Sequence, residues 1–159
     1  MQFRSLGSTG IEVSIIGLGC EHLDNKPPEL AEEVIGTALD HGVNIMDLFM
    51  PGDAVRTNIG LALRGKREKM LIQGAIGSVD LSDQYDTSRD LSICRRYFEN
   101  LLRCLNTDYI DFGMLFFLDS HEDIDAVLDN GIVAYARKLR QDGVIRAVGA
   151  SVHNPATAR

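Results

Sequence analysis

Ala-Leu-Asp-His-Gly-Val-Asn-Ile-Met-Asp, residues 38–47, passes from the end of a helical pattern into a strand. Before it, apolar residues recur at helical spacing from Leu30 to Leu39, and Gly42 marks the end of the helix. After Gly42, a short and mostly apolar run predicts a strand that ends in the carboxylate of Asp47. A helix, a glycine stop and a strand therefore form one unit, and its repetition decides the fold.

The same alternation continues in both directions from this unit. Strands are predicted at 15–20, 43–47, 70–76, 109–116 and 145–150, the first of them buried on both faces. Helices are predicted from Pro28 to just before Gly42, at about 54–63, from the end of a long loop at 78–90 to about 103, and at about 124–141. Strands that alternate with helices of this length predict right-handed crossovers and a parallel sheet.

Two α/β architectures fit this order of elements. One is a (β/α)8 barrel of the TIM type, present as roughly a half barrel, and the other is a flavodoxin-like doubly wound sheet. The second usually needs a phosphate-binding glycine loop that leads from its first strand into a helix. Here Gly17-Leu18-Gly19 is followed by Glu21, His22 and two prolines, so the half barrel is favoured.

The first fourteen residues form a separate predicted unit. Residues 2–4 and 11–13 are typical of two short strands about a glycine-containing turn. We therefore expect residues 1–14 to be a hairpin lid and residues 15–159 to be a partial barrel with five strands.

Composition excludes several classes of protein. A net charge of −7 disfavours nucleic acid as a partner, and 45% hydrophobic with 25% charged residues is typical of a globular domain. No apolar run reaches the ~20 residues that span a bilayer, and no signal-like stretch follows the first residues, so a cytoplasmic location is expected. Cys20, Cys94 and Cys104 lie too far apart for a zinc or iron–sulfur site, so reduced thiols and no metal are predicted.

Six collinear blocks carry a resemblance to a known family. They are residues 4–14 (RSLGSTGIEVS), 17–19 (GLG), 38–47 (ALDHGVNIMD), 59–65 (IGLALRG), 105–111 (LNTDYID) and 143–151 (GVIRAVGAS). In this order the sequence resembles the aldo-keto reductase family, whose members are (β/α)8 barrels that reduce carbonyls with NADPH. The resemblance covers nearly every residue here but only about the first half of the family's length.

The resemblance implies a catalytic tetrad, of which one member is present. Asp47 matches the family's aspartate. The tyrosine position falls within 50–52 (Met-Pro-Gly), the lysine position at Ala75 and the histidine position at Phe116, and none of these side chains can donate a proton. An aspartate without its lysine disfavours the negative charge that hydride transfer leaves on the carbonyl oxygen. Substitute donors expected on the same face are Glu21, His22 and Tyr85.

The resemblance also implies cofactor contacts at Cys20, Ser151 and Asn154. Ser151 matches a serine that contacts the nicotinamide carboxamide, although Val152 replaces the asparagine that usually follows. An alternative for Asn154-Pro155 is simply the start of a helix. The implied cofactor is NADP(H) and the implied partner is a small carbonyl substrate.

Two consequences and one alternative remain at this stage. A half barrel exposes the backbone of its outer strands, so we expect either pairing into a homo-oligomer or a chain that is part of a longer protein. The expected function is that of a protein related to NADPH-dependent carbonyl oxidoreductases but impaired or incomplete as a catalyst. The alternative is a non-catalytic module that binds a ligand or partner in an apolar pocket of Pro51, Ala75 and Phe116 beside Asp47.

Overall fold

A five-stranded parallel sheet forms the centre of the computed structural model, which describes residues 1–81 and 84–158. The strands are β3 (Leu18–Gly19), β4 (Ile45–Leu48), β5 (Leu71–Ile76), β8 (Ile110–Leu115) and β9 (Ile145–Ala150), and they lie side by side in this order. All four pairings are parallel. This is the half barrel that the sequence predicts.

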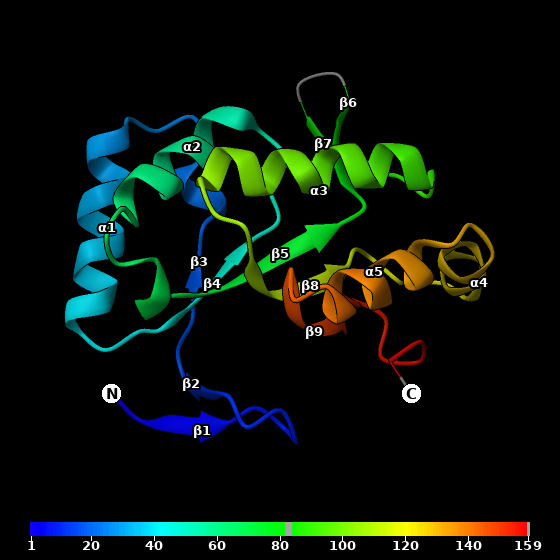
Figure 1. The fold of residues 1–159 in the computed structure, drawn as a ribbon, viewed down its shortest axis with the longest axis horizontal. Coiled ribbons are helices and arrows are strands. Elements are labelled where there is room, and N and C mark those ends of the chain that lie inside the picture. Colours follow the sequence, from blue (N-terminus) through cyan, green and yellow to red (C-terminus); the bar gives the residue numbers. More distant parts are fainter. Residues whose placement is uncertain (82–83, 159) are drawn as a thin grey trace.

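Helices α1 (Pro28–Asp40), α2 (Asp53–Ala62), α3 (Leu91–Leu105) and α5 (Ile132–Gln141) connect the strands. α1 packs against α2, and α2 against α3, so they form a layer over the sheet (Figure 1). The core lies between the two layers, where Met46 and Ile72 of the strands meet Ile35 and Phe98 of the helices. Short 3-10 helices follow β3 (η1, Glu21–Leu23) and precede β5 (η2, Arg67–Lys69).

The first predicted strand is shorter and more exposed than expected. Only Leu18 and Gly19 pair with β4, and the side chains of Ile15 and Ile16 are 49% and 59% exposed. The prediction of a strand buried on both faces at 15–20 is therefore wrong. The apolar run begins before the chain reaches the sheet, where the Ser14 hydroxyl donates to the carbonyl of Ile16 and holds a turn instead.

The predicted loop at 78–90 contains an antiparallel hairpin of β6 (Ser78–Leu81) and β7 (Gln84–Thr87). Its polar composition conceals the pairing, although Ser78 and Val79 of β6 are fully buried. Gly77, with φ 103°, directs the chain out of β5 into this hairpin, and its carbonyl accepts from Ser88 N–H where the chain returns.

The predicted helix at about 124–141 is two helices, α4 (His121–Asp129) and α5. Gly131 separates them with φ 79°, a left-handed conformation that ends a helix and that glycine adopts without strain. α4 begins in a capping box, in which the Ser120 hydroxyl accepts from Asp123 N–H and the Asp123 carboxylate accepts from Ser120 N–H.

The amino-terminal hairpin pairs β1 (Phe3–Ser5) with β2 (Glu12–Ser14). It is fastened where β4 is about to begin, because Ser14 N–H donates to Asn44 Oδ1 at 2.8 Å and Asn44 N–H donates to Ser14 Oγ at 3.1 Å. Figure 1 shows it beyond one end of the sheet. It therefore lies at the end where the strands start, opposite to Asp47, and its role as a lid stays a prediction.

Candidate functional site

A cavity of about 250 Å³ lies at the carboxyl ends of the parallel strands. This is the end at which barrel proteins build their active sites, because loops from several strands converge there. Its lining residues come from β4, β5 and β8, from the segments that follow β4, β8 and β9, from η1 after β3 and from β7: Glu21, Asp47, Phe49, Gln73, Ala75, Tyr85, Met114, Phe116, Phe117, Ser151 and His153.

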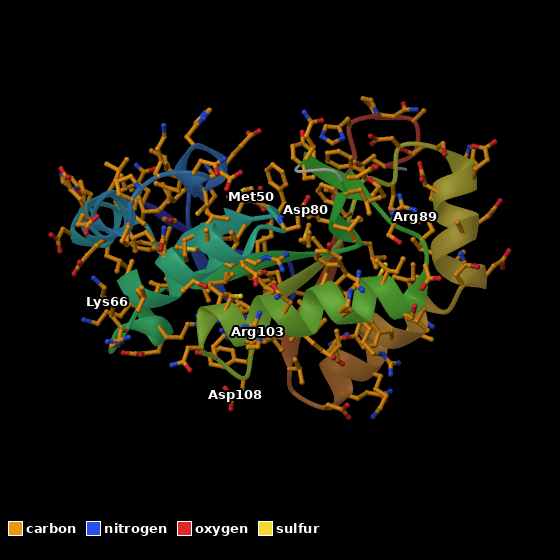
Figure 2. All side chains as sticks on the ribbon, turned by 90° about the horizontal axis from the view of Figure 1, so that it is seen from above. Met50, Lys66, Asp80, Arg89, Arg103 and Asp108 are labelled. Atoms are coloured by element: carbon orange, nitrogen blue, oxygen red, sulfur yellow. The ribbon has the colours of Figure 1, made fainter. Side chains whose placement is uncertain are left out.

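A wider hollow of about 670 Å³ lies on the other side of Tyr85. Met50 and Asp80, which are labelled in Figure 2, both line it, and so do Pro51 and Gly52. We take the smaller cavity as the candidate site because Asp47 and the residues that match the lysine, histidine and serine positions line it.

Asp47 reaches the cavity from the inner face of β4. In the strand register it lies opposite Gln73 of β5, whose Nε2 donates to Asp47 Oδ1 at 3.1 Å. Burial raises the pKa of the Asp47 carboxyl, the hydrogen bond from Gln73 lowers it in part, and the nearby charge of Glu21 raises it again. Among the described residues that line the cavity, none is a lysine or an arginine. The carboxylate of Asp47 thus has an amide as its partner, not a cation.

Four aromatic residues form one connected wall of the cavity, which we call the aromatic cluster: Phe49, Tyr85, Phe116 and Phe117. The rings of Phe116 and Phe117 stack with centroids 3.9 Å apart, and Phe49 stacks on Phe116 at 5.8 Å. Tyr85 meets Phe49 edge to face at 5.1 Å. Such contacts fix the rings relative to one another, so the wall is preformed.

Arg89 supports the aromatic cluster through the backbone of two of its members. Its guanidinium donates to the carbonyl oxygens of Phe116 and Phe117 at 2.9 and 2.7 Å and pairs with Asp123 of α4 at 2.8 Å. Figure 2 shows Arg89 beside this helix. Phe117 has φ 50°, which is unfavourable for a bulky side chain, and its N–H donates to Ser151 Oγ at 2.8 Å. The bonds that Ser151, just after β9, and Arg89 make here stabilise a backbone turn that would otherwise be strained.

The family assignment follows from comparison with known proteins. A model of the aldo/keto reductase family matches residues 15–159. The chain belongs to the aldo/keto reductase family. This agrees with the resemblance in the sequence and with the half barrel in the structure.

Individual relatives of this chain support the same assignment. An uncharacterised oxidoreductase, YqkF, of Bacillus subtilis is 27% identical over 98% of this chain and 50% of its own length. The holo form of the aldo-keto reductase AKR11C1 from Bacillus halodurans is 28% identical with a TM-score of 0.82, over 98% of this chain and 51% of that one. An aldo/keto reductase of Klebsiella pneumoniae in complex with NADP and acetate, 21% identical, shares the fold with a TM-score of 0.67 over 93% of this chain and 49% of that one. The chain thus spans about half the length of the curated relatives that it matches.

The positions that the resemblance assigns to the tetrad fall in two hollows of the structure. Asp47, Ala75 and Phe116 line the cavity together, as neighbouring strands predict. The tyrosine segment, 50–52, lines the wider hollow instead. Of the substitute donors expected from the sequence, Glu21 and Tyr85 line the cavity, whereas His22 is not among its lining residues.

The three residues with implied cofactor contacts are not brought together. Ser151 lines the cavity, and because its Oγ accepts from Phe117 N–H, its own hydroxyl proton can still be donated to a carboxamide oxygen. Asn154 is exposed and donates to the carbonyl of Asp119. The Cys20 side chain is buried beside Met46, and burial raises the pKa of its thiol to about 12. Ser151 is therefore the residue of the three whose hydroxyl is free to meet a nicotinamide carboxamide in the cavity, and the cofactor contacts at Ser151, Cys20 and Asn154 all stay predictions.

Sequence reasoning did not assign pocket roles to Gln73, Phe49, Phe117 and His153. Strand register was the missing signal for Gln73, since a parallel pairing places it opposite Asp47. His153 lines the cavity with its Nδ1 2.9 Å from Asp119 Oδ2, and its ring meets Phe117 edge to face. A carboxylate bonded to one ring nitrogen commonly orients an imidazole. Asp119 and His153 are 34 positions apart, so no local sequence pattern could predict that they meet.

The described residues show neither a metal-ligand cluster nor a membrane-spanning helix. No group of three or more His, Cys, Asp or Glu side chains there is arranged to hold a metal ion. None of the helices in residues 1–81 and 84–158 is long and apolar enough to cross a membrane.

Proposed function

We propose that this chain forms the substrate pocket and the nicotinamide end of the cofactor site in an NADP(H)-dependent carbonyl oxidoreductase that keeps the aspartate of the family's tetrad and lacks its tyrosine, lysine and histidine. The observation that carries the proposal is the cavity at the strand ends, which Asp47, Ala75, Phe116 and Ser151 line together. The resemblance places Asp47 and Ser151 at family positions, and it places Ala75 and Phe116 where the family has a lysine and a histidine. The substrate class is a small carbonyl compound.

The chemistry of the pocket must differ from that of the family. A bound reduced nicotinamide would supply the hydride, which adds to the carbonyl carbon as the C=O π electrons move to oxygen. That oxygen must then take a proton, and the family's tyrosine and lysine are absent. We propose His153 as the donor, because Asp119 holds its Nδ1 and the ring lines the cavity. Imidazolium gives its proton to the oxygen and becomes neutral imidazole. Asp47, Glu21 and Tyr85 are the other acids within the described lining.

The remaining elements of the proposal rest on the family and on the sheet. NADP(H) is the expected cofactor, with Asp47, Cys20, Ser151 and Asn154 as the residues to test. A cytoplasmic location is proposed from the sequence. Because β3 and β9 are the outer strands of the described sheet, we also propose that these residues pair with a second copy or with further polypeptide.

NADPH binding and carbonyl turnover test the proposal, in a chain that keeps any natural sequence flanking these residues. We expect calorimetric binding of NADPH, and carbonyl reduction that His153→Gln lowers by roughly 10²- to 10⁴-fold, the usual contribution of a general acid. Retained NADPH binding in this variant is the internal control. Absence of NADPH binding by the parent protein would remove the oxidoreductase proposal, and unchanged turnover in His153→Gln would remove the assigned donor.

A second candidate is a module that binds a ligand without turnover. The aromatic cluster favours it, because four packed rings form a preformed apolar wall beside Asp47. Ligand binding with no NADPH binding and no product would support this candidate over the first.

A further inference from the structure

The cavity is lined by negative charge, which disfavours the negative charge that develops on a carbonyl oxygen during reduction. Two carboxylates, Asp47 and Glu21, line it. His153 is the member of the described lining that can carry positive charge, and Asp119 already compensates it at 2.9 Å. A ligand that enters this space therefore meets net negative potential in a partly buried site, where charges are weakly screened.

The aromatic cluster strengthens the same preference. The face of an aromatic ring carries partial negative charge, so rings attract organic cations, and quaternary ammonium groups are bound in proteins by several rings together. Phe49, Tyr85, Phe116 and Phe117 line the same cavity as the two carboxylates. Rings and carboxylates acting on one ligand favour an ammonium group with apolar substituents.

The position of Ala75 indicates where such a group would lie. Ala75 is two residues beyond Gln73 on β5 and lines the cavity with it, whereas the family's lysine at this position would extend a cation toward Asp47. Alanine leaves that volume open next to an aspartate that lacks a cationic partner. The cavity, about 250 Å³, is smaller than the roughly 300–1,000 Å³ typical of drug-sized ligands.

A metal ion fits this site less well. Calcium and magnesium require about six oxygen ligands, whereas the described cavity offers the carboxylates of Asp47 and Glu21 with an apolar wall opposite. Within the described residues, no three His, Cys, Asp or Glu side chains are grouped so that they could hold a metal ion. A hydrated inorganic cation gains little from phenyl rings, whereas an alkylated ammonium does.

We propose that this pocket binds a small organic cation, a protonated amine or quaternary ammonium compound, with the ammonium group beside Asp47 and Glu21 in the space left at Ala75 and its alkyl groups against the aromatic cluster. The inference rests on the proposed function only for its choice of cavity. In an oxidoreductase it would make the substrate an amine-bearing carbonyl compound, whose own ammonium group takes the place of the missing lysine.

Choline and its neutral isostere 3,3-dimethyl-1-butanol test the inference, because they differ in charge and hardly in shape. Binding is measured by calorimetry on the chain with any natural flanking sequence. We expect choline to bind at least tenfold more tightly than the isostere. Asp47→Asn and Phe116→Leu should each reduce choline affinity about tenfold while leaving the isostere less affected, and Glu32→Gln, an exposed change on α1, should alter neither.

The outcomes separate this inference from the proposed function. Equal affinities for choline and the isostere would overturn it, and this comparison needs no variant to fold. Choline binding that survives Asp47→Asn in a folded protein would also overturn it. NADPH binding without choline binding would reject the organic cation alone, whereas choline binding without NADPH binding would reject the oxidoreductase alone.

Discussion

Asp47 affects both the candidate site and the stability of the fold. Its carboxylate is partly buried, accepts one hydrogen bond from Gln73 and lies near Glu21 of the same charge. A carboxylate in such surroundings costs folding free energy when it is ionised, which is common for residues kept for function. This loss of folding free energy comes from the charge of the carboxylate, so a neutral side chain of the same shape should avoid it.

Replacing Asp47 by asparagine should stabilise the protein at pH 7. Asparagine keeps the oxygen that accepts from Gln73 and removes the charge. Because the pKa of Asp47 is raised in the folded state above its ordinary value of 3.8, the wild type gains stability as pH falls through the folded pKa, until both states are protonated below 3.8. We expect Asp47→Asn to melt a few degrees higher at pH 7 and the difference to shrink toward pH 4, measured by circular dichroism. A lower melting temperature than the wild type at pH 7 would contradict this account.

Arg89 should matter more than an exposed arginine that makes a similar ion pair. Arg89→Gln removes two bonds to the carbonyls of the Phe116–Phe117 turn and the pair with Asp123, at 17% side-chain exposure of the arginine. We expect a loss of about 2–3 kcal/mol in urea unfolding. The matched control is Arg103→Gln, whose pair with Asp53 is 67% exposed on both sides and should contribute about 0–1 kcal/mol. Equal losses in the two variants would show that Arg89 does not support the cluster.

At the scale of elements, the approach of α2 to α3 depends on one glycine. A Cβ added at Gly60 would lie 2.7 Å from the carbonyl oxygen of Cys104 and 2.8 Å from the Cα of Leu105. Backbone atoms cannot move aside as a side-chain end can, so the helices would have to separate. The packing of this layer over the sheet is therefore fixed by a residue that carries no side chain.

Gly60→Ala and Gly36→Ala should change stability in opposite directions. Gly60→Ala should cost about 1–3 kcal/mol, the usual effect of overpacking. Gly36 lies in the interior of α1 with open space around an added Cβ, so alanine there should gain up to about 1 kcal/mol from helix propensity. Urea unfolding of both variants measures the difference. A stabilised Gly60→Ala would mean that the two helices are not in close contact.

At the scale of the whole molecule, the outer strands of the described sheet are exposed to pairing. β3 and β9 each have one neighbour in the five-stranded sheet, and β9 alternates between buried or half-buried and exposed residues. Unpaired strand edges of this kind favour association.

Residues 1–159 expressed alone should therefore self-associate. In sedimentation velocity we expect a mass above the 17.5 kDa of one chain, rising with protein concentration. A chain that also carries further natural sequence able to pair with β9 should show less of this association. A well-folded monomer of residues 1–159 at all concentrations would contradict the expectation.

The sequence by itself determined the family, the alternation of strands and helices, and Asp47 at a strand end. These features are local, because hydrophobic period, glycine stops and short motifs are read within about ten residues. Predictions from local pattern were wrong at three places. The apolar run at 15–20 begins before the chain reaches the sheet, and the stretch at 78–90, predicted as a loop, forms a hairpin. Gly131 divides the helix predicted at about 124–141 into two helices.

Only the tertiary structure decided which residues share the cavity. Gln73 reaches Asp47 through strand register, Phe117 joins the cluster through bonds to Arg89 and Ser151, and His153 meets Asp119 across 34 positions. Each of these contacts depends on how segments that are distant in the sequence pack together. Hydrophobic period and turn motifs describe only neighbouring residues, so they do not predict such contacts. The sequence shows which family side chains are missing here, and the fold shows that rings and carboxylates occupy the space around their positions.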